Sequence, residues 1–157
     1  MDKYMCRAKN GSNNWVYGYY VKKVDPLFSY SKHYILCQKE GVYPGVLNSL
    51  MTWYEVDPDT VCRYTGVNDQ HGNPIFEHDI LKVCLCYNDW SECNEIFIDS
   101  IMFENGCFCL NKVFSSDGYN ELSCVYSEIT CGDDTYDDCI FEVIGNKFDN
   151  TELMEEQ

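Results

Sequence analysis

The chain has 157 residues, the usual size of one domain, and 45% of them are hydrophobic, so a folded core over residues 1–157 is expected. The formal net charge is −15, and the excess of Asp and Glu that causes it disfavours binding of nucleic acid or of an anionic membrane by the acidic part of the chain. No run approaches the roughly 18 apolar residues of a membrane helix, and the first residues lack the apolar segment of a secretory signal, so a cytoplasmic protein is expected.

The charge is unevenly divided along the sequence. Residues 1–50 hold seven Lys and Arg against three Asp and Glu, a net charge of +4, whereas residues 51–157 hold four against 23, a net charge of −19. The acidic part should repel nucleic acid and attract basic surfaces, while the first 50 residues are mildly basic and rich in aromatic side chains.

Short strands are predicted along most of the chain, because β-branched and aromatic residues alternate between Gly, Pro, Asn and Asp breaks. The segment 15–21 contains Gly18, where a bulge is expected, and 46–52 could be a strand or a short helix. The strongest turn signal is 68–74, and only 150–156 is typical of a helix. The predicted strands are 15–21, 33–37, 60–65, 79–87, 95–103, 107–114, 122–126 and 140–144.

These spacings predict a mainly β fold: a small antiparallel barrel or sandwich of about seven or eight short strands, followed by a short C-terminal helix. Within 79–87, alternation places Leu81, Val83, Leu85 and Tyr87 on one face and Lys82, Cys84 and Cys86 on the other. This strand is therefore expected to be half-buried.

Four groups of residues, in this order, carry a resemblance that spans nearly the whole chain. They are Arg7–Lys9 with Trp15–Tyr20; Tyr54–Val61 with Tyr64–Gly66; Asp69, Gly72, Pro74–Glu77 and Asp79–Ile80; and Glu142–Asn146 with Asp149–Asn150 and Glu152–Leu153. Together they resemble the YopX family of phage and prophage proteins. The resemblance implies a phage or prophage origin and a mainly β fold, in a family without an established biochemical role or defined catalytic residues.

Two positions depart from the family pattern. His78 stands where the family usually has Gly, and Cys62-Arg63 stands where it usually has Gly-Gln. The middle of the chain, from about Cys86 to Cys139, matches nothing in the family and holds most of the cysteines and the densest acidic residues. A specific activity is expected to reside there.

Two sets of residues are candidate binding sites. Clustered carboxylates at Asp133, Asp134, Asp137 and Asp138, interleaved with tyrosine, can imitate nucleic acid toward a basic protein, and they lack the ligand spacing of an EF-hand calcium loop. The aromatic residues Trp15, Tyr17 and Tyr19 could stack a base or nucleotide, although such a run is more often a core strand or an oligomer contact.

The eleven cysteines are expected to be reduced, because their number is odd and no secretory signal is present. Cys84, Cys86, Cys107 and Cys109 could hold zinc if their strands were neighbours, but zinc sites more often use two-residue spacing, and thiols of this kind more often pack in the core as small hydrophobic groups. An enzyme would have to use a cysteine or His78, which has carboxylates at Glu77 and Asp79 and His71 nearby.

The primary hypothesis is a non-enzymatic phage accessory protein without a cofactor. It would bind a basic or nucleic-acid-binding host or phage protein through its acidic surface, for instance as an anti-defence inhibitor. The alternatives are a protein that binds or sequesters a nucleotide signal through its first 50 residues, and a cysteine- or histidine-dependent enzyme or zinc protein. The sequence leaves a homo-oligomer open.

Overall fold

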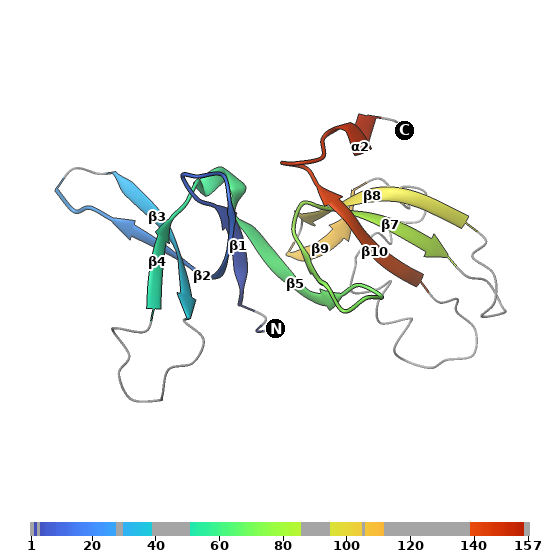
Figure 1. Ribbon diagram of the computed structural model, residues 1–157, viewed down its shortest axis with the longest axis horizontal. Coiled ribbons are helices and arrows are strands. Elements are labelled where there is room, and N and C mark those ends of the chain that lie inside the picture. The colour runs from blue at the N-terminus through green and yellow to red at the C-terminus, as the bar shows by residue number, and fades with distance from the viewer. Residues whose placement is uncertain are drawn as a thin grey trace. The chain divides into compact units, whose positions relative to one another are not determined.

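A computed structural model describes residues 2, 4–27, 30–38, 51–85, 95–104, 106–111 and 139–155. These residues form antiparallel strands and one short C-terminal α-helix, drawn in Figure 1. Contacts divide the chain into two compact units, unit 1 over residues 1–64 and unit 2 over residues 65–157. Each unit is described by itself below. The expectation of a single domain over 1–157 stays a prediction.

Unit 1 is built on five strands in the sheet order β4-β3-β2-β1-β5. Asp57 caps the 3-10 turn Pro58–Thr60 by accepting the Asp59 amide at 3.0 Å, and Thr60 accepts the Lys9 amide at 2.8 Å. Strand β5 then continues into unit 2, where β6 is its other neighbour. The strands are β1 (Cys6–Lys9), β2 (Trp15–Val24), β3 (Ser31–Gln38), β4 (Met51–Glu55) and β5 (Cys62–Asn68).

Strand β2 changes its pairing partner at Gly18. Residues 15–18 pair with β1, and residues 19–24 pair with β3. A Cβ atom on Gly18 would lie 2.8 Å from the carbonyl carbon of Leu36 and 3.1 Å from the Ile35 side chain. The expected irregularity at Gly18 therefore takes the form of a close backbone approach, which only glycine permits.

Unit 2 contains a four-stranded antiparallel sheet in the order β10-β7-β8-β9, together with β6 and helix α2. Asp79, which is fully buried, opens β7, and its carboxylate accepts the Phe76 amide at 2.7 Å. The elements are β6 (Pro74–Phe76), β7 (Asp79–Leu85), β8 (Glu95–Glu104), β9 (Cys107–Leu110), β10 (Cys139–Asn146) and α2 (Glu152–Glu155).

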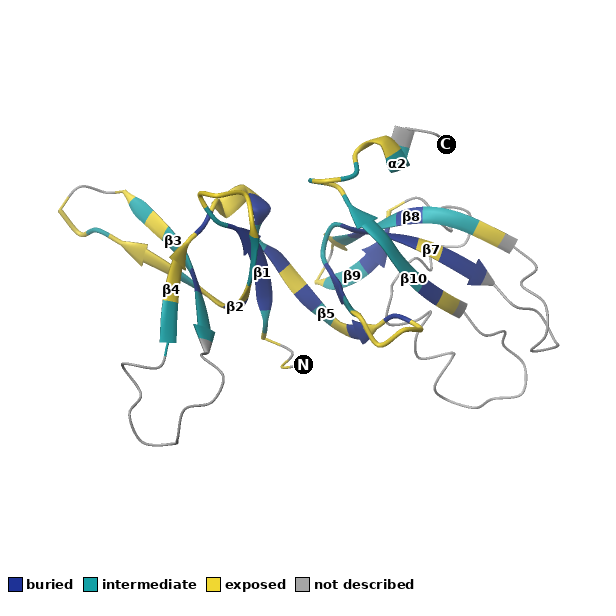
Figure 2. Ribbon diagram, viewed as in Figure 1, coloured by how far each residue is buried: buried dark blue, intermediate teal, exposed yellow. Residues whose placement is uncertain are grey.

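Each unit has its own hydrophobic cluster. In unit 1, Ala8 and Ile35 are fully buried and pack with Cys6 and Val56. In unit 2 the cluster draws on β5, β6, β7, β8, β9 and β10, and consists of Val67, Ile75, Leu81, Val83, Ile101, Leu110 and Phe141. Figure 2 shows this burial along β7 and the contrasting exposure of β2 and β4.

The mainly β, antiparallel fold with a short C-terminal helix is confirmed. Neither strand order closes into a barrel within the described residues. The strands expected at 15–21, 33–37, 79–87 and 140–144 and the hairpin around residues 104–106 are present, with adjusted ends. The segments 46–50 and 122–126 lie outside the described residues.

One expected strand has different ends, and one strand was not expected. The strand expected at 60–65 begins at Cys62, after a 3-10 turn, and runs through Gly66 to Asn68. Strand β1 was not expected, because a charged Arg-Ala-Lys segment does not look like a buried strand; it is buried because β2 and β5 pair with both of its edges. Cys84 is 8% exposed, as expected of a cysteine that packs in the core.

None of the described helices is long and apolar enough to cross a membrane.

Candidate functional site

Strand register gathers aromatic and basic side chains on one face of the unit 1 sheet. Tyr19, Leu36 and Trp53 lie directly across β2, β3 and β4, and Tyr34 follows on the same face because side chains alternate along a strand. Tyr17, Tyr19 and Trp53 are 43%, 38% and 44% exposed. We call this surface the unit 1 outer face; its residues are Arg7, Lys9, Trp15, Tyr17, Tyr19, Val21, Lys23, Lys32, Tyr34, Leu36, Trp53 and Glu55.

Cations lie against the aromatic rings of this face. The Lys23 ammonium lies 3.9 Å from the centre of the Trp53 ring and 5.3 Å from that of Tyr34, and these two rings meet edge to face at 5.7 Å. The Arg7 guanidinium lies 4.6 Å from the centre of the Trp15 ring. Such contacts hold the rings in fixed orientations and place positive charge beside flat apolar surface.

The carboxylates near this face are already engaged. Glu55 accepts a hydrogen bond from Lys32 at 3.0 Å, and Asp2 accepts the Tyr19 hydroxyl at 2.9 Å. The bond to Asp2 and the charge of its carboxylate raise the pKa of Tyr19, so its phenol stays neutral at physiological pH. The face therefore presents neutral rings and the Lys23 cation beside the Lys32–Glu55 ion pair, which suits a ligand with a flat aromatic part and a negative charge.

The opposite face of the same three strands provides an internal comparison. Tyr20, Ile35 and Tyr54 lie across it, with Ile35 in the core. Tyr20 and Tyr54 are 36% and 38% exposed, close to Tyr19 and Trp53. The Tyr20 hydroxyl contacts Nδ1 of His33. Neighbouring residues of one strand thus differ mainly in the face from which they project.

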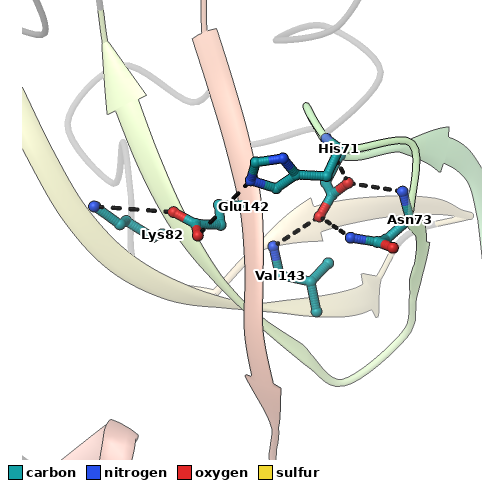
Figure 3. Close-up of polar contacts among 6 residues, drawn as sticks. His71, Asn73, Lys82, Glu142 and Val143 are labelled. Carbon is teal, nitrogen blue, oxygen red and sulfur yellow. Dashed lines mark hydrogen bonds and ion pairs between the residues drawn. The ribbon is translucent and has the colours of Figure 1, made fainter.

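In unit 2, Asp69 organises the turn between β5 and β6 and ties it to β10 (Figure 3). One carboxylate oxygen accepts the amides of His71 and Asn73 at 2.9 and 2.8 Å. The other accepts the Asn73 side-chain amide at 3.0 Å and the Val143 amide at 3.3 Å. Burial alone would raise the pKa of Asp69, but these hydrogen bonds together outweigh it and lower the pKa.

Beside this turn, Glu142 lies between His71 and Lys82, with each nitrogen 3.9 Å from a carboxylate oxygen (Figure 3). An open cavity of about 210 Å³ adjoins it and is lined by Gln70, Lys82, Cys84, Ile96, Ile140 and Glu142. The side chains of His71, Lys82 and Glu142 are all well exposed to solvent, and exposed pairs of this length are worth roughly 0–1 kcal/mol each. The cluster provides no preorganised general base.

The histidine expected in an enzyme occupies a turn. His78 has a φ of +68°, in the left-handed region that favours glycine. Its amide donates to Ile101 at 2.8 Å and its carbonyl accepts the Lys147 amide at 3.0 Å. Asp79 is fully buried, and one of its carboxylate oxygens accepts a hydrogen bond from the Phe76 amide. Its carboxylate therefore stabilises the backbone of this turn.

Among the described residues, Cys84, Cys107 and Cys109 do not converge as a zinc site requires. Cys84 on β7 is disulfide-bonded, so the expectation of reduced cysteines is wrong there, whereas Cys6, Cys37, Cys62, Cys107 and Cys109 form no disulfide. Strand β8 separates β7 from β9, and Cys84 lies opposite Ile96 whereas Cys109 lies opposite Met102. Cys107 and Cys109 are free thiols, and Cys86 lies outside the described residues. Within the described part of the chain, no three His, Cys, Asp or Glu side chains gather as a metal site.

The acidic candidates Asp133, Asp134, Asp137 and Asp138 lie outside the described residues. The aromatic candidates Trp15, Tyr17 and Tyr19 share one face of β2. Sequence reasoning missed Lys23, Tyr34 and Trp53, which complete this face. The alternation of 19, 21 and 23 could have indicated Lys23, but the register that brings β3 and β4 alongside is not visible in the sequence.

The carboxylates of Asp57, Asp69 and Asp79 stabilise turns of an antiparallel, mainly β protein. The chain belongs to the YopX protein family, whose pattern matches residues 7–155. Among solved structures it is similar to protein EF1440 from Enterococcus faecalis, with 19% identity, 96% of each chain covered and a TM-score of 0.46, a likeness too slight to carry an argument. No curated protein matches the chain.

Replacing His78 tests its role as a turn residue. We expect His78→Gly to be about 1 kcal/mol more stable than His78→Ala in urea unfolding, because a side chain at this φ is strained whereas glycine is not. Both variants lose the imidazole, so their difference isolates the backbone. An alanine variant as stable as the glycine variant would contradict the prediction.

Replacing Asp69 tests the turn that joins β5, β6 and β10. Asp69→Asn should lower the free energy of unfolding by about 2 kcal/mol at neutral pH, because hydrogen bonds to a charged acceptor are lost. The lowered pKa means that this stabilisation is complete above about pH 5 and is lost as the pH falls through the pKa of the folded state. Urea unfolding across this range measures it, with the exposed Glu104→Gln as the control; a pH-independent difference contradicts the prediction.

Proposed function

We propose that this chain is a non-enzymatic binding protein, encoded by a phage or prophage and acting in the cytoplasm, that binds a nucleotide on the unit 1 outer face. The observation that carries the proposal is that Tyr19 and Trp53 are exposed on one face, on either side of Leu36, with the Lys23 ammonium against the Trp53 ring. A base stacked on such a ring gains about 1–3 kcal/mol, and a nearby cation attracts the phosphate.

The net charges of the two units support a ligand site in unit 1 rather than in unit 2. Residues 1–64 carry eight Lys and Arg and six Asp and Glu, a net charge of +2, whereas residues 65–157 carry three and 20, a net charge of −17. An anionic ligand is therefore repelled by unit 2 and accepted by unit 1. On the unit 1 outer face the one carboxylate, that of Glu55, is already paired with Lys32.

Nucleotide binding is measured by calorimetry with mono- and dinucleotides up to millimolar concentration. We expect binding that Tyr19→Ala weakens about tenfold and that Tyr20→Ala leaves unchanged, because Tyr20 projects from the opposite face. Equal effects of the two variants, or no binding by the wild type, contradict the proposal. Thermal unfolding of each variant verifies that it is folded.

A second candidate function is favoured by the 20 acidic residues of unit 2. The acidic surface would bind a basic or nucleic-acid-binding protein of the host or phage, as an anti-defence inhibitor that imitates nucleic acid. This function and nucleotide binding use different units, so one chain can carry both.

Charge reversal tests this second function on a partner protein captured from lysate. Asp133→Lys with Asp134→Lys should weaken the binding of that partner at least about tenfold, and added salt should weaken it steeply. The control pair, Glu104→Lys with Glu152→Lys, makes the same change in net charge elsewhere in unit 2. If neither added salt nor the two substitutions at Asp133 and Asp134 weaken binding, the acidic surface does not imitate nucleic acid.

A further inference from the structure

We infer that the ligand of the unit 1 outer face is an extended single strand of nucleic acid rather than a free nucleotide. The inference rests on the proposed function and specifies its ligand. It follows from the number of exposed rings, their spacing and the small number of cations among them.

The rings cover more surface than one base can occupy. Trp15, Tyr17 and Tyr19 alternate along β2, which spaces their Cα atoms about 7 Å apart. Trp53 lies across β3 from Tyr19, at roughly 10 Å. A single base stacks on one ring, so a mononucleotide would leave the other exposed rings in water. Successive bases of one strand can use several rings at once.

The spacing also selects a single strand over a duplex. Bases in a double helix are stacked about 3.4 Å apart and hide their flat faces from a protein. Rings about 7 Å apart match bases that have been pulled out of that stack. Only a strand without a complementary partner presents its bases in this way at little cost, because no pairing has to be broken.

The charges predict which interaction supplies the affinity. Lys23 and Lys32 are exposed, whereas Arg7 and Lys9 are each 8% exposed, and both lie against Trp15. Because Lys32 is already paired with Glu55, only about one to two phosphate contacts are expected. They give a slope of binding against salt between about −0.7 and −1.4 on logarithmic axes, far shallower than that of a basic groove. Stacking therefore contributes most of the affinity, and bases matter more than phosphates.

The test uses the full chain and fluorescence anisotropy with labelled homopolymers of about 12 nucleotides, oligo-dT and oligo-U. Unlabelled thymidine monophosphate and a duplex of the same length serve as competitors. We expect oligo-dT or oligo-U to bind at least about tenfold more tightly than the mononucleotide, and the duplex to compete weakly.

Matched variants locate the site. Trp53→Ala should weaken binding about tenfold, whereas Tyr54→Ala, on the same strand but the opposite face, should not. Lys23→Glu should weaken binding more than Lys22→Glu, although both change the net charge equally. Circular dichroism and thermal unfolding exclude a loss of fold.

The outcomes separate this inference from the function on which it rests. If the mononucleotide binds as tightly as the oligomers, or the duplex competes equally, nucleotide binding stands and the single-strand ligand is wrong. If no nucleotide and no oligomer binds, both are wrong. Equal losses for Trp53→Ala and Tyr54→Ala place the ligand elsewhere and overturn the inference.

Discussion

Gly18 is the point on which the arrangement of unit 1 depends. There β2 exchanges β1 for β3 as its partner, and the missing side chain lets the Leu36 carbonyl approach. With that approach in place, Ile35 and Ala8 enter the core from one face of the sheet. The residues on either side of Gly18, Tyr17 and Tyr19, are directed to the other face and stay exposed.

Because side chains alternate along a strand, core residues and the residues proposed to bind a ligand lie on opposite faces of the same strand. Ile35 is buried while the next residue, Leu36, lies between Tyr19 and Trp53 on the outer face. Substitutions on the outer face can therefore remove ligand contacts at small cost to the core. This is why Tyr19 and Tyr20, or Trp53 and Tyr54, serve as matched pairs.

The residues that carry the family resemblance have structural tasks in the described parts of the chain. Asp57 caps a 3-10 turn, Asp69 holds a loop and Asp79 binds a backbone amide. Carboxylates that accept backbone amides in this way stabilise turns, and those of Asp69 and Asp79 are also buried.

Sequence patterns predicted the strands whose residues alternate strongly, such as β2 and β7, because alternation is local. They failed at β1, whose charged residues are buried only through pairing with strands distant in sequence. The unit 1 outer face was predicted only in part, because it too depends on pairing between strands that are distant in sequence. Trp15, Tyr17 and Tyr19 lie on one strand, but Trp53 joins them through the register of β3 with β4, which no local pattern encodes.

The central claim is that the unit 1 outer face contacts the ligand. Ultraviolet cross-linking of oligo-dT to the full chain, followed by mass spectrometry of the digested adducts, tests it most directly. We predict cross-links at Tyr17, Tyr19 or Trp53, with Tyr20 and Tyr54 unmodified. Cross-links confined to residues 65–157, or spread equally over both faces of the sheet, would contradict the account.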